Sequence, residues 1–174
     1  GLFLNWKTTH QGIQISASAR CDINIANSDD TLKLIKNNIN YFDSEQTTQL
    51  FFSGSIQLQK QIHQNLLTEL HIGRGVRSAD MLERYIKFMP VGFDKYDYLG
   101  NPQLLPEANN QIEWSIVLTT NNKIQASANV FYAYVQNYIM GQLLPSTVAM
   151  PKSQGVIGVK QFININQVSI SGFE

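Results

Sequence analysis

The sequence predicts an all-β fold, an antiparallel up-and-down meander of about eight long strands. Three observations predict it. Apolar side chains recur at every second position, which is the period of a β-strand with two different faces. The alternating segments are about 10 to 15 residues long, well beyond the average strand of a globular domain. Tight and long connections alternate between them.

The segment 13–25 shows the alternation most clearly. Its odd positions are apolar, and its even positions are polar without exception: Gln14, Ser16, Ser18, Arg20, Asp22 and Asn24. The same alternation predicts strands around 52–58, 66–72, 112–118, 124–134 and 155–174. Each predicted strand therefore has one apolar face and one polar face, and we expect neighbours in sequence to pair antiparallel.

The connections fall into two classes. Tight turns are predicted at 63–65, 120–123 and 164–167, and long loops at 27–46, 76–109 and 137–154. Outer-membrane β-barrels carry short turns on their periplasmic rim and long loops on their extracellular rim. Tyr132, Tyr134 and Tyr138 approach the long-loop rim, where amphipathic rings suit a polar boundary. This layout favours an arc of such a barrel.

The same alternation is also typical of water-soluble sandwiches and small closed barrels. In those folds the apolar face points inward and the polar face meets water. Periodicity does not show which face is wet, so two interpretations stay open. The first is an arc of an outer-membrane barrel, and the second is a soluble β-barrel module that binds a small apolar ligand.

Composition excludes several functions. The 174 residues carry 13 basic and 13 acidic side chains, so no net positive field attracts nucleic acid. No apolar stretch approaches the length of a membrane-spanning helix. Cys21 has no partner for a disulfide or a zinc site, and we place it on the apolar face. Only 15% of residues are charged, whereas 16 glutamines and 16 asparagines supply neutral polar groups.

No catalytic pattern is present, and neither enzyme activity nor a cofactor is expected. The order Ser-His-Asp and a phosphate-binding glycine loop are both absent. His71 has the parity of the polar face and precedes the long loop that carries Met81 and Met89. Imidazole and thioether ligands together suit copper. The alternative is that both methionines pack the loop and His71 lines a polar wall. His71 and Met81 are therefore weak metal candidates, and no metal site is assigned firmly.

The segment 73–113 resembles the barrel of TonB-dependent outer-membrane receptors. That family shows a strand ending like R-G-F-R, a glutamate-aromatic pair in the next loop, and a G-N-P-x-L-x-P-E element before the following strand. The matching residues here are Arg74, Gly75, Val76, Arg77, Glu83, Arg84, Tyr85, Gly100, Asn101, Pro102, Leu104, Pro106 and Glu107. Asn129, Phe131, Tyr134, Tyr138 and the final S-G-F-E resemble later elements, so the resemblance covers about 51–174.

The resemblance implies that residues 1–174 are a single barrel segment without the plug domain and the remaining strands. The parent would be a receptor in the bacterial outer membrane that imports a scarce nutrient, with a metal ion or metal chelate as the favoured cargo. Its partners would be outer-membrane lipid, the plug and periplasmic TonB. We expect such an excised arc to curl so that its apolar face turns inward.

The long loops 76–109 and 137–154 are predicted to contribute most to cargo binding, and His71 and Arg74 precede the first of them. The ligand-binding candidates are His71, Arg77, Met81, Glu83 and Met89. Arg74, Pro102, Pro106 and Glu107 are predicted to be structural residues where loop meets strand. Both prolines restrict the residues before them to extended conformations, and we expect Glu107 to pair with Arg77 or Arg84 and so fix the rim.

Overall fold

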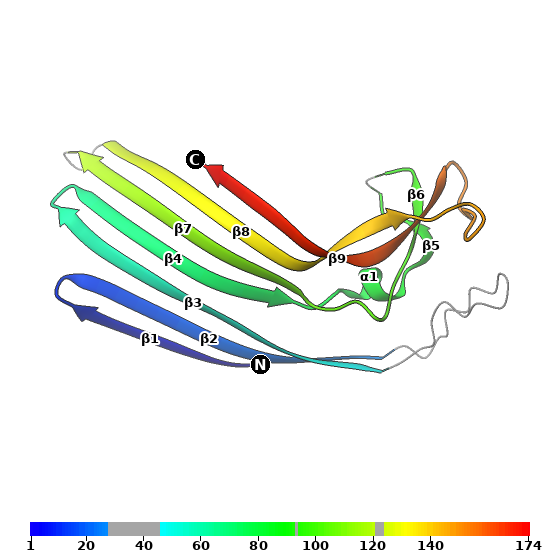
Figure 1. Cartoon of the computed structure of the whole chain (residues 1–174), viewed down its shortest axis with the longest axis horizontal. Helices are drawn as coiled ribbons and strands as arrows, with labels where there is room; N and C mark the ends of the chain where they lie inside the picture. The colour runs from blue at the N-terminus through cyan, green and yellow to red at the C-terminus, as the bar shows by residue number, and fades with distance from the viewer. Residues whose placement is uncertain (28–45, 93, 121–123) are drawn as a thin grey trace.

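The computed structural model describes residues 1–27, 46–92, 94–120 and 124–174, which form a single curved sheet of nine strands (Figure 1). The sheet does not close on itself, and β1 and β5 are its two ends. The strands are β1 (Leu2–His10), β2 (Ile13–Ala26), β3 (Thr47–His63), β4 (Leu66–Arg77), β5 (Lys87–Pro90), β6 (Tyr96–Leu99), β7 (Glu107–Thr120), β8 (Ile124–Leu143) and β9 (Gly158–Phe173). The one described helix is α1 (Met81–Tyr85).

Seven long strands make the wall of the sheet in the order β1-β2-β3-β4-β7-β8-β9. Every neighbouring pair in this wall is antiparallel. The β1–β2 connection is a two-residue turn at Gln11 and Gly12, both with positive φ (48° and 76°), as the tightest hairpins require. The predicted meander of long strands is confirmed.

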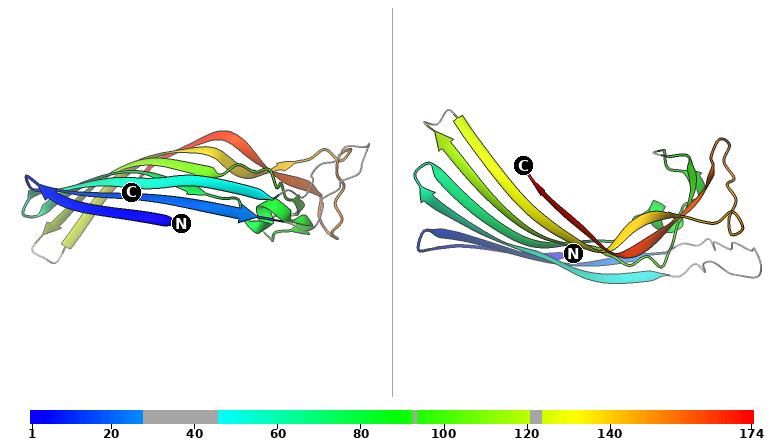
Figure 2. Two further views of the ribbon diagram at one scale, coloured as in Figure 1. Left: turned by 90° about the horizontal axis from the view of Figure 1, so that it is seen from below. Right: turned by 45° about the horizontal axis from the view of Figure 1, so that its top comes forward.

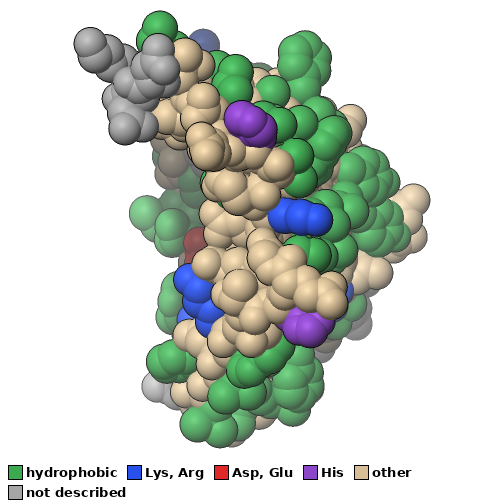
Figure 3. All heavy atoms as spheres, turned by 90° about the vertical axis from the view of Figure 1, so that its left-hand side faces the viewer, with side chains coloured by type: hydrophobic (Ala, Val, Ile, Leu, Met, Phe, Trp, Pro, Cys, Tyr) green, Lys and Arg blue, Asp and Glu red, His purple; other side chains and the backbone are tan. Residues whose placement is uncertain are grey.

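The two faces of the wall differ as the alternation requires. Large apolar side chains stay exposed on one face. In the row formed by Ile72, Ile112 and Tyr132, which are neighbours on three adjacent strands, each side chain is 44–50% exposed. The opposite face is polar and linked by side-chain hydrogen bonds, including Gln14 to Gln59 and Ser18 to Ser55. Viewed along the strands from the short-turn end, hydrophobic side chains gather along one side of the arc (Figure 3).

At the end opposite the short turns, the sheet folds back into a small lobe. The lobe is made of α1, β5, β6, the C-terminal part of β8 and the N-terminal part of β9 (Figure 2). Here β6 pairs with β9 in parallel, from Tyr96 opposite Gly158 to Leu99 opposite Gln161. The lobe holds the buried apolar core of the described chain. One cluster contains Leu99, Ala149 and Val159, and a second contains Ala79, Leu104 and Ile139.

Strands β8 and β9 bend where they leave the wall for the lobe (Figure 1). Asn137 has a positive φ of 53° at this point, a conformation that asparagine tolerates better than most residues. The Asn164 amide donates to the carbonyl oxygens of Asn137 (2.7 Å) and Leu105 (3.1 Å), and its oxygen accepts from the Leu105 N–H (2.8 Å). Asn164 therefore ties the bend to the chain entering β7.

Several sequence-based expectations about the connections are wrong. Residues 164–167 are not a turn but lie inside β9, where Asn164 bridges the bend and Gln167 accepts from the Tyr134 hydroxyl. The loop predicted at 137–154 begins later, since β8 continues to Leu143. The loop 76–109 is not irregular but contains α1, β5 and β6. Residues 28–45 of the loop 27–46 and residues 121–123 of the turn 120–123 lie outside the described residues, whereas the turn at 63–65 is confirmed.

The expectation that the apolar face turns inward is also wrong. Phe52, Ile56 and Trp114 are 51–61% exposed, and no second layer covers them in the described parts of the chain. The second interpretation, a soluble β-barrel module, requires a closed interior that encloses an apolar ligand. The described sheet does not close and has no such interior. A closing contact would have to bring β1 and β9 together, and the curvature of the arc keeps these strands apart (Figure 1).

Among the described residues, no helix has the length and apolar character needed to cross a membrane.

We predict that Leu99→Ala opens the lobe without unfolding the wall. Leu99 is fully buried between Ala149 and Val159, and truncating such a leucine costs about 3 kcal/mol. Hydrogen exchange followed by mass spectrometry should show faster exchange in 87–99 and unchanged exchange in β2 and β3. Leu105→Ala is the matched control, because Leu105 is 53% exposed. Equal exchange in 87–99 for both variants would contradict the core assignment.

Candidate functional site

The candidate site is the rim where the wall strands β3, β4 and β7 meet the lobe. Local sequence builds its first element. Asp80 caps helix α1: its carboxylate accepts from the Glu83 N–H (2.7 Å), and the Glu83 carboxylate accepts from the Asp80 N–H (2.8 Å). This reciprocal pair is a capping box, and it begins a one-turn helix directly after β4.

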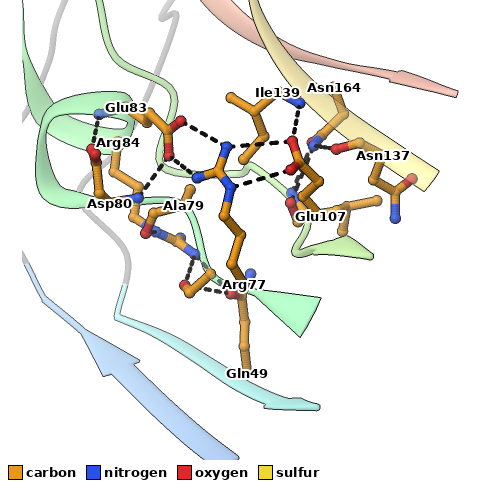
Figure 4. Close-up of polar contacts among 12 residues, drawn as sticks. Gln49, Arg77, Ala79, Asp80, Glu83, Arg84, Glu107, Asn137, Ile139 and Asn164 are labelled. Atoms are coloured by element: carbon orange, nitrogen blue, oxygen red, sulfur yellow. Dashed lines mark hydrogen bonds and ion pairs between the residues drawn. The ribbon is translucent and has the colours of Figure 1, made fainter. Parts of the chain in front are cut away.

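Arg77 stands at the end of β4 between two carboxylates (Figure 4). Its Nη1 lies 2.9 Å from Glu83 Oε2, and its Nε lies 3.2 Å from Glu107 Oε1 at the start of β7. Glu107 Oε2 also accepts from the Ile139 N–H of β8 (2.9 Å). Hydrogen bonding to Glu83 and then to Glu107 raises the pKa of Arg77 above its usual value. One guanidinium thus connects α1, β4, β7 and, through Glu107, β8.

Arg84 is the buried counterpart of Arg77, with 1% of its surface exposed. Its guanidinium donates to the carbonyl oxygens of Ala79 (3.1 Å) and Pro102 (3.0 Å), to Gln49 Oε1 (2.7 Å) and to Ser78 Oγ (3.0 Å). Gln49 belongs to β3, and its amide in turn donates to the Leu104 carbonyl (3.0 Å). The residues 78–106 are therefore attached to the wall through a fully hydrogen-bonded cation.

Gly100 makes this attachment possible. A Cβ at this position would overlap the backbone of Arg84 and Tyr85, so only glycine lets the returning chain pass so close to α1. The Gly100 N–H donates to the Ile86 carbonyl at 2.8 Å, and the Asn101 N–H donates to the Glu83 carbonyl at 2.9 Å. The stretch 100–102 thus packs against helix α1 and holds it at the rim.

A second buried charge fixes the lobe. Asp97 is fully buried, and its Oδ2 accepts from the N–H groups of Lys152 (2.6 Å) and Ser153 (2.9 Å). Burial raises the pKa of Asp97, but the hydrogen bonds from Ser153 and Lys152 outweigh it and leave the pKa below its usual value. Asp97 thereby joins the loop after β8 to β6.

A half-buried ion pair holds the same pair of strands, β6 and β9. Lys160 Nζ lies 2.6 Å from Asp94 Oδ2, and the Tyr98 hydroxyl donates to the same oxygen at 2.8 Å. The Lys160 ammonium also lies over the Tyr96 ring, 4.3 Å from its centroid. These contacts hold the short strand β6 against the N-terminal end of β9.

The structure brings some of the predicted site residues together. Arg77, Glu83 and Glu107 form one network, and Glu107 pairs with Arg77 and not with Arg84. Pro102 is buried and accepts from Arg84, and Pro106 directly precedes β7, its carbonyl accepting from Asn137 at 3.4 Å. In this network the side chains of Arg77 and Glu83, two of the predicted ligand-binding residues, make their contacts within the chain.

The remaining candidates are dispersed. His71 lies six residues before Arg77, about 20 Å down the strand, in a polar-face hollow of about 280 Å³ that Lys7, Ser18 and Gln57 also line. Met81 and Met89 are exposed on the lobe, at 65% and 59%. The structure does not bring His71 and Met81 together. No group of three or more His, Cys, Asp or Glu side chains suited to a metal ion occurs among the described residues.

Arg74 is not at the loop boundary but three residues inside β4. It shares the apolar face with Ile72, and its Nη1 donates to Asn110 Oδ1 (2.7 Å) and Gln136 Oε1 (3.3 Å).

Sequence reasoning missed the roles of Asp80, Arg84 and Asp97. The D-x-x-E spacing of Asp80 and Glu83 is a capping-box signature and was sufficient to find the helix. Arg84 and Asp97 carried no such signal, since their partners are backbone groups and side chains distant in sequence.

The comparisons with known proteins agree with this geometry. The family model described as "TonB dependent receptor-like, beta-barrel" matches residues 2–174, so the chain belongs to the TonB-dependent receptor β-barrel family. This is an outer-membrane family of receptors and transporters, not of enzymes. A search of curated proteins finds no match.

Solved structures with the same fold include three receptors. The copper transporter OprC matches with a TM-score of 0.67 at 18% identity, covering 98% of this chain and 24% of OprC. A double mutant of the Serratia marcescens hemophore receptor HasR, in complex with its hemophore HasA and heme, matches at 0.65 and 16%, covering 98% and 30%. The siderophore receptor PirA from Pseudomonas aeruginosa matches at 0.59 and 13%, covering 99% and 37%. The chain thus spans between about a quarter and two fifths of these receptors.

We predict that Arg84→Met releases residues 78–106 from the wall. The substitution leaves the Pro102 carbonyl, Gln49 and Ser78 without their buried donor, a loss on the order of 3 kcal/mol. Limited proteolysis should then cut within 78–106 and spare the long strands of the wall. Lys95→Met removes a cation elsewhere in the lobe and is the control. Cleavage as slow as in the wild type would contradict the anchoring role.

We also predict that the lobe loosens in acid. The pKa of Asp97 is lowered in the folded state, so its stabilisation is present above the ordinary aspartate pKa and is lost as the pH falls through the lowered folded value. Hydrogen exchange of 94–99 should be constant at neutral pH, after correction for intrinsic rates, and should accelerate only below the ordinary pKa. Asp97→Asn should remove this pH dependence, and its persistence in that variant would contradict the assignment.

Proposed function

We propose that this chain is a segment of the barrel wall and extracellular rim of a receptor in the bacterial outer membrane that imports a scarce nutrient by energy-coupled transport. The observation that carries the proposal is the two-faced wall of a TonB-dependent receptor family member, joined at one end to a lobe by buried polar contacts. The wall lines the passage, and the lobe with its adjacent loops meets the cargo first.

The favoured cargo is a metal ion or metal chelate. The support is that structures with this fold include a copper transporter, a hemophore receptor and a siderophore receptor. In this chain the exposed thioethers of Met81 and Met89 are available on the lobe, and imidazole and thioether groups are ligands for soft metals. Plug domain and TonB are the partners of the whole receptor in this proposal, and the chain performs no catalysis.

The rim network gives the lobe its role in this proposal. Cargo capture requires loops that hold a defined shape before binding, because ordering loops at the moment of binding costs affinity. Arg77 is saturated by Glu83 and Glu107, and Arg84 by backbone and side-chain oxygens. We therefore assign both arginines to holding the rim, and assign cargo contact to exposed lobe residues such as Met81 and Met89.

Uptake measurements test the proposal. A strain lacking the full-length protein should take up less of a radiolabelled metal, supplied free or as a chelate, than the complemented strain, and a protonophore should abolish the difference. Met81→Ala with Met89→Ala should raise the half-saturating metal concentration about tenfold if both thioethers bind the cargo. Met140→Ala, in β8 outside the lobe loops, is the control. Equal uptake with and without the protein, for every form of metal supplied, would refute metal import.

A further inference from the structure

Strands β3 and β4 separate before they reach the lobe (Figure 1). Their ladder ends at the pair Gly54 and Arg74, although both strands continue toward the lobe. Within the described residues, 47–53 form ladder pairs with β2 only. The wall therefore contains a seam, which lies between 50–53 of β3 and 75–78 of β4.

Side chains, and not backbone pairs, hold the two sides of the seam together. Next to the last ladder pair, the Val76 N–H donates to Ser53 Oγ at 3.0 Å. At the lobe end, Gln49 Oε1 accepts from the Arg84 guanidinium at 2.7 Å. Between Gln49 and Ser53 the strand spans about 14 Å, the length of a four-residue extended segment. The seam is thus closed at both ends and open between them.

The backbone edge of β3 is unpaired along the seam. In an antiparallel pair, every second residue directs its N–H and C=O away from the partner strand. Because 50–53 pair with β2, alternate backbone groups of this stretch point toward the seam, and no backbone hydrogen bond reaches them from the other described residues. An unpaired strand edge is a template for another extended chain.

A hollow of about 490 Å³ adjoins the seam on the polar face. Its lining includes Arg20, Asn24, Phe51, Ser53, Gly75 and Arg77. Gly75 leaves it open, because a Cβ at this position would meet nothing within 4 Å. The charges of the lining are balanced, since Arg20 pairs with Asp22 and Arg77 pairs with two glutamates. The hollow therefore favours a neutral polar ligand over an ion, and half-buried Phe51 offers it an apolar contact.

We propose that the seam binds an extended, amide-linked chain of the cargo, which adds to residues 50–53 of β3 as a short strand. Strand addition supplies main-chain hydrogen bonds, and the hollow at Gly75 receives side chains of the bound segment. The cargo is then a metal chelate whose metal-binding groups are carried on a peptide backbone. The proposal rests on the proposed function, since it takes the polar face to line the passage. It adds recognition of the organic part of the chelate to the metal contacts assigned to the lobe.

The test uses the full-length protein and two iron(III) chelates with the same hydroxamate groups, one built on a tetrapeptide backbone and one on an alkyl backbone of equal length. Equilibrium dialysis with radiolabelled iron gives both dissociation constants. The wild type should bind the peptide chelate about tenfold more tightly, the difference expected for about two net hydrogen bonds. Hydrogen exchange of 50–53 should slow with the peptide chelate and stay unchanged with the alkyl chelate.

Gly75→Phe fills the hollow, so this variant should bind the two chelates equally. Thr9→Phe is the matched control, because it places the same ring on the polar face near the short turns and should keep the tenfold preference. A preference kept in Gly75→Phe overturns the proposal.

Two outcomes in the wild type overturn the proposal without any variant. They are equal or absent binding of the two chelates, and unchanged exchange of 50–53 with the peptide chelate. Energy-coupled uptake of both chelates without preference would reject binding in the seam and keep the proposed function. Preferred binding of the peptide chelate without energy-coupled uptake would keep the seam and reject import.

Discussion

Each long strand of this sheet places its alternate side chains in two different surroundings, and the rest of the structure depends on that constraint. One face carries exposed apolar rows such as Ile72 and Ile112, and the other carries hydrogen-bonded amides and hydroxyls such as Gln14 and Ser18. A strand between two such surroundings has no core to bury, so its backbone must be satisfied by its neighbours along its whole length. Within the wall, the strands from β2 to β8 have an antiparallel neighbour on each side and meet that requirement.

The alternation of apolar and polar side chains ends at the rim, and beyond it the chain is stabilised by a different set of interactions. Wall residues are held by ladder hydrogen bonds, whereas the lobe is held by buried apolar side chains and by two buried charges that accept or donate several hydrogen bonds. Arg84 and Asp97 are both buried, and each is compensated by neutral hydrogen-bond partners and not by an opposite charge. Neutral partners satisfy a buried charge without requiring a second ion to leave water. The lobe is therefore rigid where it meets the wall.

The glycines near the rim show how little space this arrangement leaves. Gly100 lets the returning chain cross α1, and Gly54 lets β2 approach β3. In the first case the missing side chain closes a contact within the lobe. In the second it leaves a recess beside Arg74 on the apolar face.

The sequence by itself determined the class of fold, the family and six of the seven strands of the wall, since no strand was predicted at Leu2–His10. Strict alternation in 13–25 and 112–118 reports a local property, the surroundings of each residue's two faces, and local properties are readable from one chain. The motif residues Gly100, Asn101, Pro102 and Pro106 likewise act through their own backbone restrictions and their immediate neighbours.

Only the tertiary structure decided the contacts that join distant segments. The parallel pairing of β6 with β9, the Asn164 bridge across the bend, and the partners of Arg84 and Asp97 all connect residues far apart in the chain. The polar run at 164–167 was misread as a turn for the same reason, since a polar side chain that bridges two carbonyls looks identical in sequence to one that faces water. Periodicity also left open which face is covered, because an apolar stripe has the same pattern whether lipid or protein lies against it.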